Sequence, residues 1–450
     1  MRFFLKLKSV FLETLDIENG DKNLTVAAQD HTRRLVDAFK RKDFKTAEKL
    51  ALSGTQNFPN FKIGWQVLSA LYGAADRKSE ATQAAKAVVM CDPADPNAHF
   101  NLGVALYKNG ELESARAAYN DSLRYNPDDA DAYANLGVIA HDLGQQKLAF
   151  DHYDKALKLA PNVPAMTLNI VSLLTTFRPS KIEPNSLPNL NEKIRQIGAR
   201  LAATDLGSDG EIFSHLAEAI HLVQASDFQL WTNLSQITHR NFHTLNCERH
   251  LAIFSEHNII PEYCFGCYKV QIEPQTVTDL IKLNLLFQRL ELEENNIRKC
   301  MVELRPAIPG KYKGLVYCPN PESAARVVQH MKAEIAELFE RPMNIFMKRG
   351  CSEYSLVHPD YARLNTPLGA AMNYDERWRS VEKTFDLSRG ENRQRKPLPR
   401  LNGLNLEDIL IICKWAQYAS CIGDESYKLV TVDPPAYSEI AKLAVTRVAE

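Results

Sequence analysis

Residues 99–110 read HFNLGVALYKNG, and residues 133–144, 34 positions later, read YANLGVIAHDLG. The same step separates members of two further series in the first third of the chain. These series are the prolines Pro59, Pro93, Pro127 and Pro161 and the alanines Ala47, Ala81, Ala115 and Ala149. Self-similarity at a fixed period of this length is typical of repeat architectures. The first third of the chain is therefore predicted to be a solenoid.

Each unit is predicted to contain two helices that pack closely. Small residues such as Gly103 and Ala115 let the two backbones approach, while Tyr119 fills the groove toward the next unit. Proline suits the end of a unit because it cannot continue a helix. The unit before the two best copies has Asp76 where those copies have a glycine, Gly110 or Gly144, in the turn between their helices. The first unit, near Gln29, keeps mainly Ala47, Phe44 and Pro59. This first unit is interpreted as the cap of the array.

The period and these residue types resemble the tetratricopeptide repeat family over about residues 28–162. The resemblance implies an all-α array over 28–177, with about four repeats and a capping helix. In this family the first helices line a concave groove that binds a peptide or a helix of another protein. The charged clamp that some members use to hold a terminal carboxylate is absent, since the matching positions hold Val36, Gln66, Ala70, Phe100 and Asn101.

The resemblance also assigns groove positions in this chain. They are Ile63, Gln66, Asn97, Phe100, Val104, Tyr107, Lys108, Asp131, Ala134, Val138 and His141. Their apolar members favour an apolar or mixed partner segment. The alternative is that the chain covers this surface itself, with its C-terminal domain or with residues 1–27, where apolar residues from Phe3 to Leu15 fall near helical spacing. Residues 1–27 are expected to form an amphipathic helix that packs on the first repeat, with docking on a membrane surface as the other reading.

Composition excludes few functions but narrows the choice of partners. The chain has 450 residues, a net charge of −1 and nine cysteines. A balanced charge argues against nucleic acid as a partner, and an odd number of cysteines without a secretory signal favours a reducing cytoplasm. No transmembrane segment and no cofactor are predicted, and the oligomeric state stays open.

The second half is predicted to hold several further segments. Residues 190–258 read as helical, and the pattern in 263–360 follows the order βαββαβ of a ferredoxin-like α+β domain. Residues 361–403 are interpreted as a linker, and 404–450 as a helix, a strand and a second helix. The fold class is thus multidomain, an all-α solenoid followed by helices and an α+β domain.

Three groups of residues in this half are candidates for chemistry. His239, His243, Cys247, His250 and His257 would share one face of a continuous helix and could hold a metal, although a polar helix face explains them as well. Cys264 and Cys267 have the spacing of a metal or redox pair, but they precede a strand, which favours buried thiols. Cys351, which follows two basic residues, and His358 could form a nucleophile and its base, or simply a strand end with a turn.

A weaker resemblance concerns residues 312–332. The segment YKGLVYCPNPESAARVVQHMK is similar to the third strand and second helix of RNA-recognition motif domains, but it has too few aromatic residues to stack several bases. The leading hypothesis is therefore an interaction or scaffold protein whose C-terminal module has an unknown ligand. The alternative is a repeat-fused transferase or hydrolase with an unfamiliar site in 231–450, drawing on Glu273, Glu303, Lys348, Arg349 and Cys351.

Overall fold

The computed structural model describes residues 26–58, 60–161, 164–228, 230, 232, 234–239, 246–294, 296–364, 372–389, 403–434 and 440–444. The chain divides into two compact units, Met1–Leu173 and Leu174–Glu450. Apart from residues 26 and 27, the helix predicted over 1–27 lies outside the described residues.

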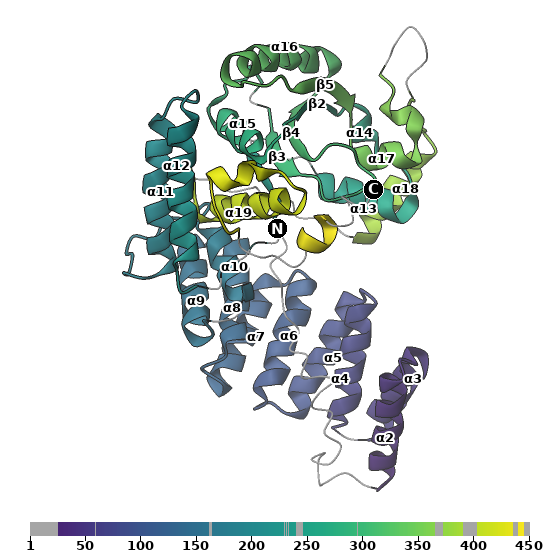
Figure 1. Ribbon diagram of the computed structural model, residues 1–450. Helices are drawn as coiled ribbons and strands as arrows, with labels where there is room; N and C mark the ends of the chain where they lie inside the picture. The colour runs from purple at the N-terminus through teal and green to yellow at the C-terminus, as the bar shows by residue number, and fades with distance from the viewer. Residues whose placement is uncertain are drawn as a thin grey trace. The chain divides into compact units, whose positions relative to one another are not determined.

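The first unit is a stack of helices in which neighbours along the chain pack on one another (Figure 1). They are α2 (Val26–Lys40), α3 (Phe44–Asn57), α4 (Lys62–Ala74), α5 (Lys78–Cys91), α6 (Pro96–Lys108), α7 (Leu112–Tyr125), α8 (Ala130–Asp142), α9 (Gln146–Leu159) and α10 (Pro164–Leu173). The side chains of Asp43, Asp95 and Asp129 accept backbone N–H groups at the starts of α3, α6 and α8. Aspartate favours these starts because it satisfies donors that have no partner within the helix.

Glycine in the first helix of a repeat makes room for an aromatic ring from the second. A Cβ atom at Gly103 would lie 2.8 Å from the ring of Tyr119, and one at Gly137 would overlap the ring of Tyr153. Both rings are buried, and Tyr119 also accepts a hydrogen bond of 3.1 Å from Asn135 in the following repeat. The tyrosine thus fastens its own repeat and the next one together.

The turn inside each repeat needs left-handed backbone. Residues 42, 76, 110 and 144 are 34 positions apart, and φ is positive at Lys42 (60°), Asp76 (58°), Gly110 (84°) and Gly144 (74°). Glycine adopts this conformation without steric cost, whereas a lysine or an aspartate does not. The two less regular repeats therefore keep the same turn geometry despite their side chains.

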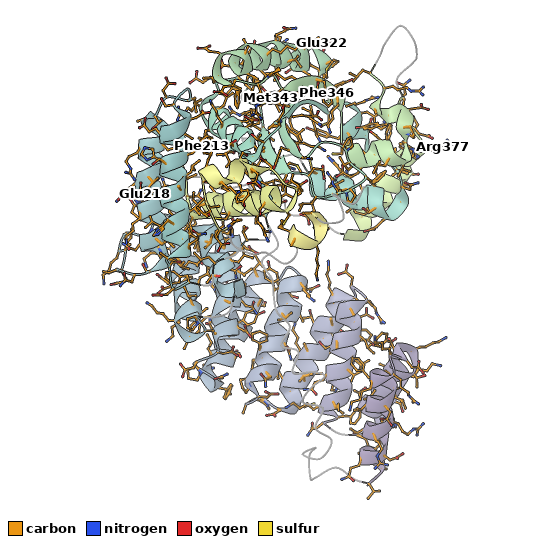
Figure 2. The ribbon with its side chains drawn as sticks, viewed as in Figure 1. Phe213, Glu218, Glu322, Met343, Phe346 and Arg377 are labelled. Atoms are coloured by element: carbon orange, nitrogen blue, oxygen red, sulfur yellow. The ribbon has the colours of Figure 1, made fainter. Side chains whose placement is uncertain are left out.

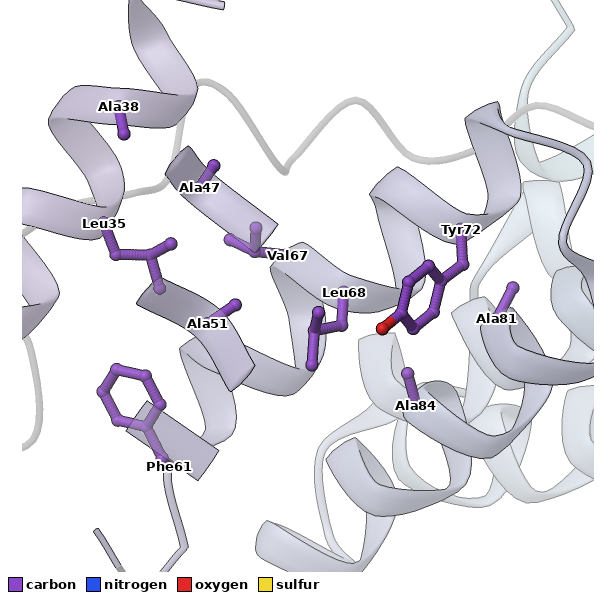
Figure 3. Packing of buried hydrophobic residues seen from close by; sticks show 10 residues of the cluster. All are labelled: Leu35, Ala38, Ala47, Ala51, Phe61, Val67, Leu68, Tyr72, Ala81 and Ala84. Atoms are coloured by element: carbon purple, nitrogen blue, oxygen red, sulfur yellow. The ribbon is translucent and has the colours of Figure 1, made fainter. Parts of the chain in front are cut away.

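The core of the first repeats is built from small, branched and aromatic residues on α2 to α5 and at the start of α4 (Figure 3). Its buried members are Leu35, Ala38, Ala47, Ala51, Phe61, Val67, Leu68, Tyr72, Ala81 and Ala84. Ala47 and Ala81 are two of the residues with the 34-residue step, and their exposed fractions are 0% and 4%. The alanines recur because only a small side chain fits where neighbouring helices approach closely.

The second unit contains a five-stranded antiparallel sheet with the order β1-β3-β4-β2-β5. Its strands are β1 (Gln236–His239), β2 (Tyr268–Glu273), β3 (Arg298–Val302), β4 (Tyr312–Cys318) and β5 (Asn344–Arg349). Helices α15 (Val277–Arg289) and α16 (Pro321–Leu338) pack on this sheet. Leu283 and Phe287 of α15 lie over Gly314 of β4, which identifies the face that α15 covers.

Further helices complete the second unit. They are α11 (Leu187–Ala203), α12 (Asp209–Gln224), α13 (Cys247–His257), α14 (Glu262–Phe265), α17 (Ser352–Val357), α18 (Trp378–Arg389) and α19 (Leu406–Cys421), with the 3-10 helices η2 (Pro359–Ala362) and η3 (Glu425–Leu429). Helix α19 is buried from Leu406 to Ala419 and packs on α11, α12, α15, β1 and β3. Its Trp415 donates to the carbonyl of Ser235 at 2.9 Å.

Three features of the second unit differ from the sequence-based expectations. The helix expected from residue 228 to 258 is replaced by strand β1 and helix α13, and Asn246 between them caps α13. The segment over 361–403 contains α18, which packs on α13 and is anchored where Arg249 meets Asp386 at 2.7 Å. The strand expected near residue 428 is the 3-10 helix η3. In each case, contacts with distant segments decide the secondary structure against the local hydrophobic pattern.

Candidate functional site

The predicted groove residues of the array fall into two classes. Phe100, Val104, Ala134 and Val138 are buried, with exposed fractions from 0% to 7%. Phe100 and Val104 belong to the core of α6 to α8, where the Phe100 ring meets that of Tyr119 edge to face at 5.4 Å. The accessible members are the partly exposed Ile63, Gln66, Asn97, Tyr107, Asp131 and His141 and the exposed Lys108. The accessible set is consequently more polar than the whole set.

A hydrogen bond between neighbouring repeats orders one part of this surface. Tyr107 of α6 donates to Asp142 of α8 at 2.7 Å, and Nδ1 of His141 lies 3.8 Å from the same carboxylate. The Asp142 side chain is only 3% exposed. The two repeats are therefore linked through residues at the ends of their first helices.

The five residues of the predicted histidine stripe do not share one helix. His239 is on β1, where its Nε2 lies 3.0 Å from Oδ1 of Asn284, while Cys247, His250 and His257 are on α13. His243 lies outside the described residues. Burial lowers the pKa of His250 to about 4, and its ring stacks on Tyr263 at 5.3 Å. In the part of the chain that the structure describes, no group of three or more potential ligands could hold a metal ion.

Cys264 and Cys267 lie in a protected environment. Burial raises the pKa of Cys264 to about 12 and that of Cys267 to about 11. The Cys264 sulfur lies 3.5 Å from the Tyr354 hydroxyl, and Tyr361 donates to the Cys264 carbonyl at 2.6 Å. Both thiols stay protonated at neutral pH, which matches structural cysteines rather than a redox pair. None of the nine cysteines is in a disulfide bond in the part of the chain that the structure describes.

Cys351 and His358 have different partners. The Lys269 ammonium group donates to the Cys351 sulfur at 3.1 Å. His358 Nε2 lies 3.1 Å from the carbonyl of Asn258, and its ring packs near Phe254 and Trp378. Among the described residues no hydrogen bond joins this cysteine to this histidine. The arrangement therefore pairs Cys351 with a lysine instead of the expected base.

Each of four strands contributes one lysine to the sheet face opposite α15. The lysines are Lys269 on β2, Lys299 on β3, Lys313 on β4 and Lys348 on β5, and we call this surface the lysine face. Gly314 and Cys300 are paired on the side of the sheet that α15 covers. Because side chains alternate between the two faces along a strand, Lys313 and Lys299, which lie next to them in the chain, are on the opposite face. The only signal of the lysine face in the sequence is the single lysine of each strand. Taken alone, such a lysine indicates an ordinary solvent-exposed face.

Within the described part of the chain, only one of the four lysines has an acidic partner. Lys313 donates to Glu303 at 2.9 Å, and Arg305 donates to the same carboxylate at 2.7 Å and also pairs with Glu353. Burial alone would raise the pKa of Glu303, but these hydrogen bonds overcome it and lower the pKa to about 2. Glu303 is thus ionised, and its charge is balanced within its own cluster.

The polar residues considered for an enzyme site are divided between different surroundings. Lys348 and Cys351 lie near Lys269, whereas Arg349 turns away and donates to the carbonyls of Phe265 and Met372. Glu273 accepts hydrogen bonds from Gln271 and Asn344. These residues therefore do not converge on one point.

A separate cavity of about 590 Å³ lies between the start of α12, the start of α15 and η3. Asp209, Asp279, Lys282 and Arg341 are among its lining residues. Lys282, which is 5% exposed, binds Asp209 at 2.6 Å. Because this pair neutralises the buried lysine, Lys282 is not available to an ionic ligand in the cavity.

Comparison with known proteins identifies the array. Residues 71–124 and 100–164 match a family model described as tetratricopeptide repeat. No curated protein matches the chain. Among the residues that the structure describes, none of the helices has both the length and the hydropathy needed to cross a bilayer.

Similar solved structures cover parts of the chain. The crystal structure of MamA is 22% identical, covers 31% of this chain and 81% of that chain, and has a TM-score of 0.30. YrrB, whose structure is described as a TPR protein with an unusual peptide-binding site, is 20% identical, with coverages of 31% and 72% and a TM-score of 0.30. PilW, a type IV pilus biogenesis factor, is 14% identical, with coverages of 45% and 80% and a TM-score of 0.30.

Proposed function

Because residues 71–164 belong to the tetratricopeptide repeat family, we propose that the array α2–α10 serves as a scaffold that binds a segment of a partner protein. The observation that carries this proposal is a row of accessible side chains on the first helices. Ile63, Asn97 and Asp131 occupy the same position in three successive repeats, and each is partly exposed. A regular row along a solenoid suits an extended segment, which can meet one repeat after another.

The chemistry of this row favours a mixed partner segment. Asn97 supplies an amide, Asp131 a carboxylate and Lys108 an exposed ammonium group. The apolar positions Phe100 and Val138 are buried and contribute packing instead. We therefore expect a segment recognised mainly through hydrogen bonds and charge, with an apolar contact at Ile63.

Site-directed photo-crosslinking of the full chain tests the proposal. A photoreactive amino acid is placed at Asn97 or Lys108, and as matched controls at Lys86 or Lys147, which are exposed on second helices. We expect one partner to be captured from the first-helix positions and not from the controls. Substitution of Asn97 or Lys108 by alanine should then weaken binding of that purified partner, because each removes a group from the row. Equal capture at both sets of positions would refute binding through this row.

We also propose that the sheet of the second unit is a ferredoxin-like module with β1 added at its edge. The chain order β2-α15-β3-β4-α16-β5 and the antiparallel pairing of β2 with both β4 and β5 support this assignment. Such a module would act as a second binding domain of the scaffold. A cytoplasmic location completes the proposal, and it is supported by nine cysteines that form no disulfide bond among the described residues.

A further inference from the structure

Three lysines of the lysine face, Lys269, Lys299 and Lys348, have no carboxylate within ion-pair distance among the described residues, whereas Lys313 is paired with Glu303. Lys269 and Lys348 are directly paired across β2 and β5, so like charges face each other on neighbouring strands. Directly opposed like charges destabilise a sheet. Within the ranges that the structure describes, neither lysine has a carboxylate within ion-pair distance, and Lys299 has no hydrogen-bond partner.

The groups in direct contact with Lys269 and Lys348 are a sulfur, a ring face and a hydroxyl, and the carboxylate of Glu353 acts on Lys299 and Lys348 from beyond ion-pair distance. Lys269 is 4% exposed, donates to the Cys351 sulfur and lies 4.8 Å from the centre of the Tyr317 ring. Lys348 donates to the Ser352 hydroxyl at 2.8 Å. A buried ammonium group is costly without a counter-charge. An anion in direct contact with these lysines would supply that counter-charge.

A second, independent observation comes from Gln271, which is on the same face two residues after Lys269. Its side chain is 3% exposed, and its amide nitrogen donates to Glu273 at 2.8 Å. Its Oε1 atom is buried and has no hydrogen-bond partner in the described part of the chain. Buried acceptors are nearly always satisfied, so this oxygen needs a donor from beyond the described residues. A ligand that combines anionic oxygens with a hydroxyl group would supply both.

We propose that the lysine face binds a small phosphate monoester, with Lys269, Lys299 and Lys348 holding the phosphate oxygens. The partly exposed ring of Tyr317 lies beside Lys269 and offers a surface for the organic part of the ligand. Phe346, which is labelled in Figure 2, lies on β5. Its neighbour across the strands is Gln271 of β2. A polynucleotide fits less well, because it needs a row of accessible aromatic residues and a broad positive surface.

The protonation of two of these lysines makes the binding sensitive to pH. Burial, followed by the charge of Lys269, lowers the pKa of both Lys299 and Lys348 to about 8. The other titratable groups that act on the pair are Cys247 from α13, Lys313 from β4, and Cys351 and Glu353 at α17. Both lysines are charged below about pH 8 and lose their protons above it. Phosphate binding should therefore weaken as the pH rises through this value, and binding near it should take up protons.

The test is calorimetric titration of the full chain with inorganic phosphate, at pH values below and above the pKa of these lysines. Lys299→Met and Lys348→Met are the test variants, and Lys332→Met on the exposed side of α16 is the matched control. Because hydrogen bonds between charged groups contribute more to binding than neutral ones, each test variant should bind phosphate about tenfold more weakly or worse. The control variant should bind as the natural chain does.

Thermal unfolding separates ligand binding from a merely structural role. Removing a charge from a group of like charges should leave the unliganded protein as stable or more stable, while the stabilisation by phosphate is lost. A test variant that loses stability without ligand and still binds phosphate normally would overturn the proposal. Absence of phosphate binding to the natural chain would also overturn it, and binding of a single-stranded oligonucleotide without phosphate binding would show a nucleic-acid surface instead.

Discussion

Replacement of Gly137 by alanine tests the close approach inside a repeat. Alanine normally stabilises the interior of a helix by about 1 kcal/mol relative to glycine. Here the added methyl group would overlap the ring of Tyr153, which is 1% exposed. Insertion of a methyl group into a packed core costs about 1–3 kcal/mol. The steric cost should outweigh the gain in helix propensity, so Gly137→Ala is expected to destabilise α8 and α9 by up to about 2 kcal/mol.

Gly73→Ala is the matched control in the same unit. A Cβ atom at Gly73, near the end of α4, would meet no atom within 4 Å. This variant should gain up to about 1 kcal/mol, since only the propensity term acts. The two identical chemical changes should thus have opposite signs.

Hydrogen exchange measured by mass spectrometry is the suitable assay, because a chain with two units does not unfold in one step. Peptides from α8 and α9 report the local free energy of opening in Gly137→Ala, and peptides from α4 and α5 report it in Gly73→Ala. If Gly137→Ala protected its helices as well as the natural chain does, the requirement for glycine beneath the tyrosine would be refuted.

Two further predictions concern charge and backbone conformation. Glu303, which is 1% exposed, has its pKa lowered from 4.5 to about 2, so its stabilising contribution is complete above the higher value and is lost as the pH falls toward the lower one. The contribution to the free energy of unfolding is about 3 kcal/mol and can be measured by acid unfolding of the natural chain. In Glu303→Gln this dependence of stability on pH should be much smaller. The variant should also be less stable at neutral pH, because Lys313 loses its partner. Lys42→Gly should stabilise the first repeat by about 0.5 kcal/mol, since φ is 60° at this position. Hydrogen exchange in α2 and α3 checks it, with Lys42→Ala as a control that should bring no gain.

The array was predictable from sequence because its contacts are local and repeated. Gly103 and Tyr119 are 16 residues apart, and the same pair recurs one period later as Gly137 and Tyr153. A contact that appears several times at one spacing leaves a readable pattern even in a single sequence. The repeat family could therefore be predicted from the residues alone. The burial of Phe100 could not, since it depends on the packing of three helices.

The second unit was less readable because its contacts join distant segments. The histidine pattern over residues 239–257 suggested one continuous helix, but β1 instead pairs with β3, some sixty residues later in the chain. Such pairing is decided by the sheet and not by the local period. The candidate metal stripe and the candidate pair of Cys351 with His358 depended on local spacing, and neither arrangement forms in the ranges that the structure describes.

The amino-acid sequence alone specifies the repeat, its period and the residue types that its helices require, because a solenoid is built from contacts within and between adjacent units. Which charges gather on the lysine face depends instead on tertiary structure. Each lysine looks like an ordinary exposed residue on its own strand, and the strand register then brings Lys269, Lys299 and Lys348 to one side of the sheet. Register is set by the whole hydrophobic pattern of the sheet, so no single segment carries the information that these charges meet.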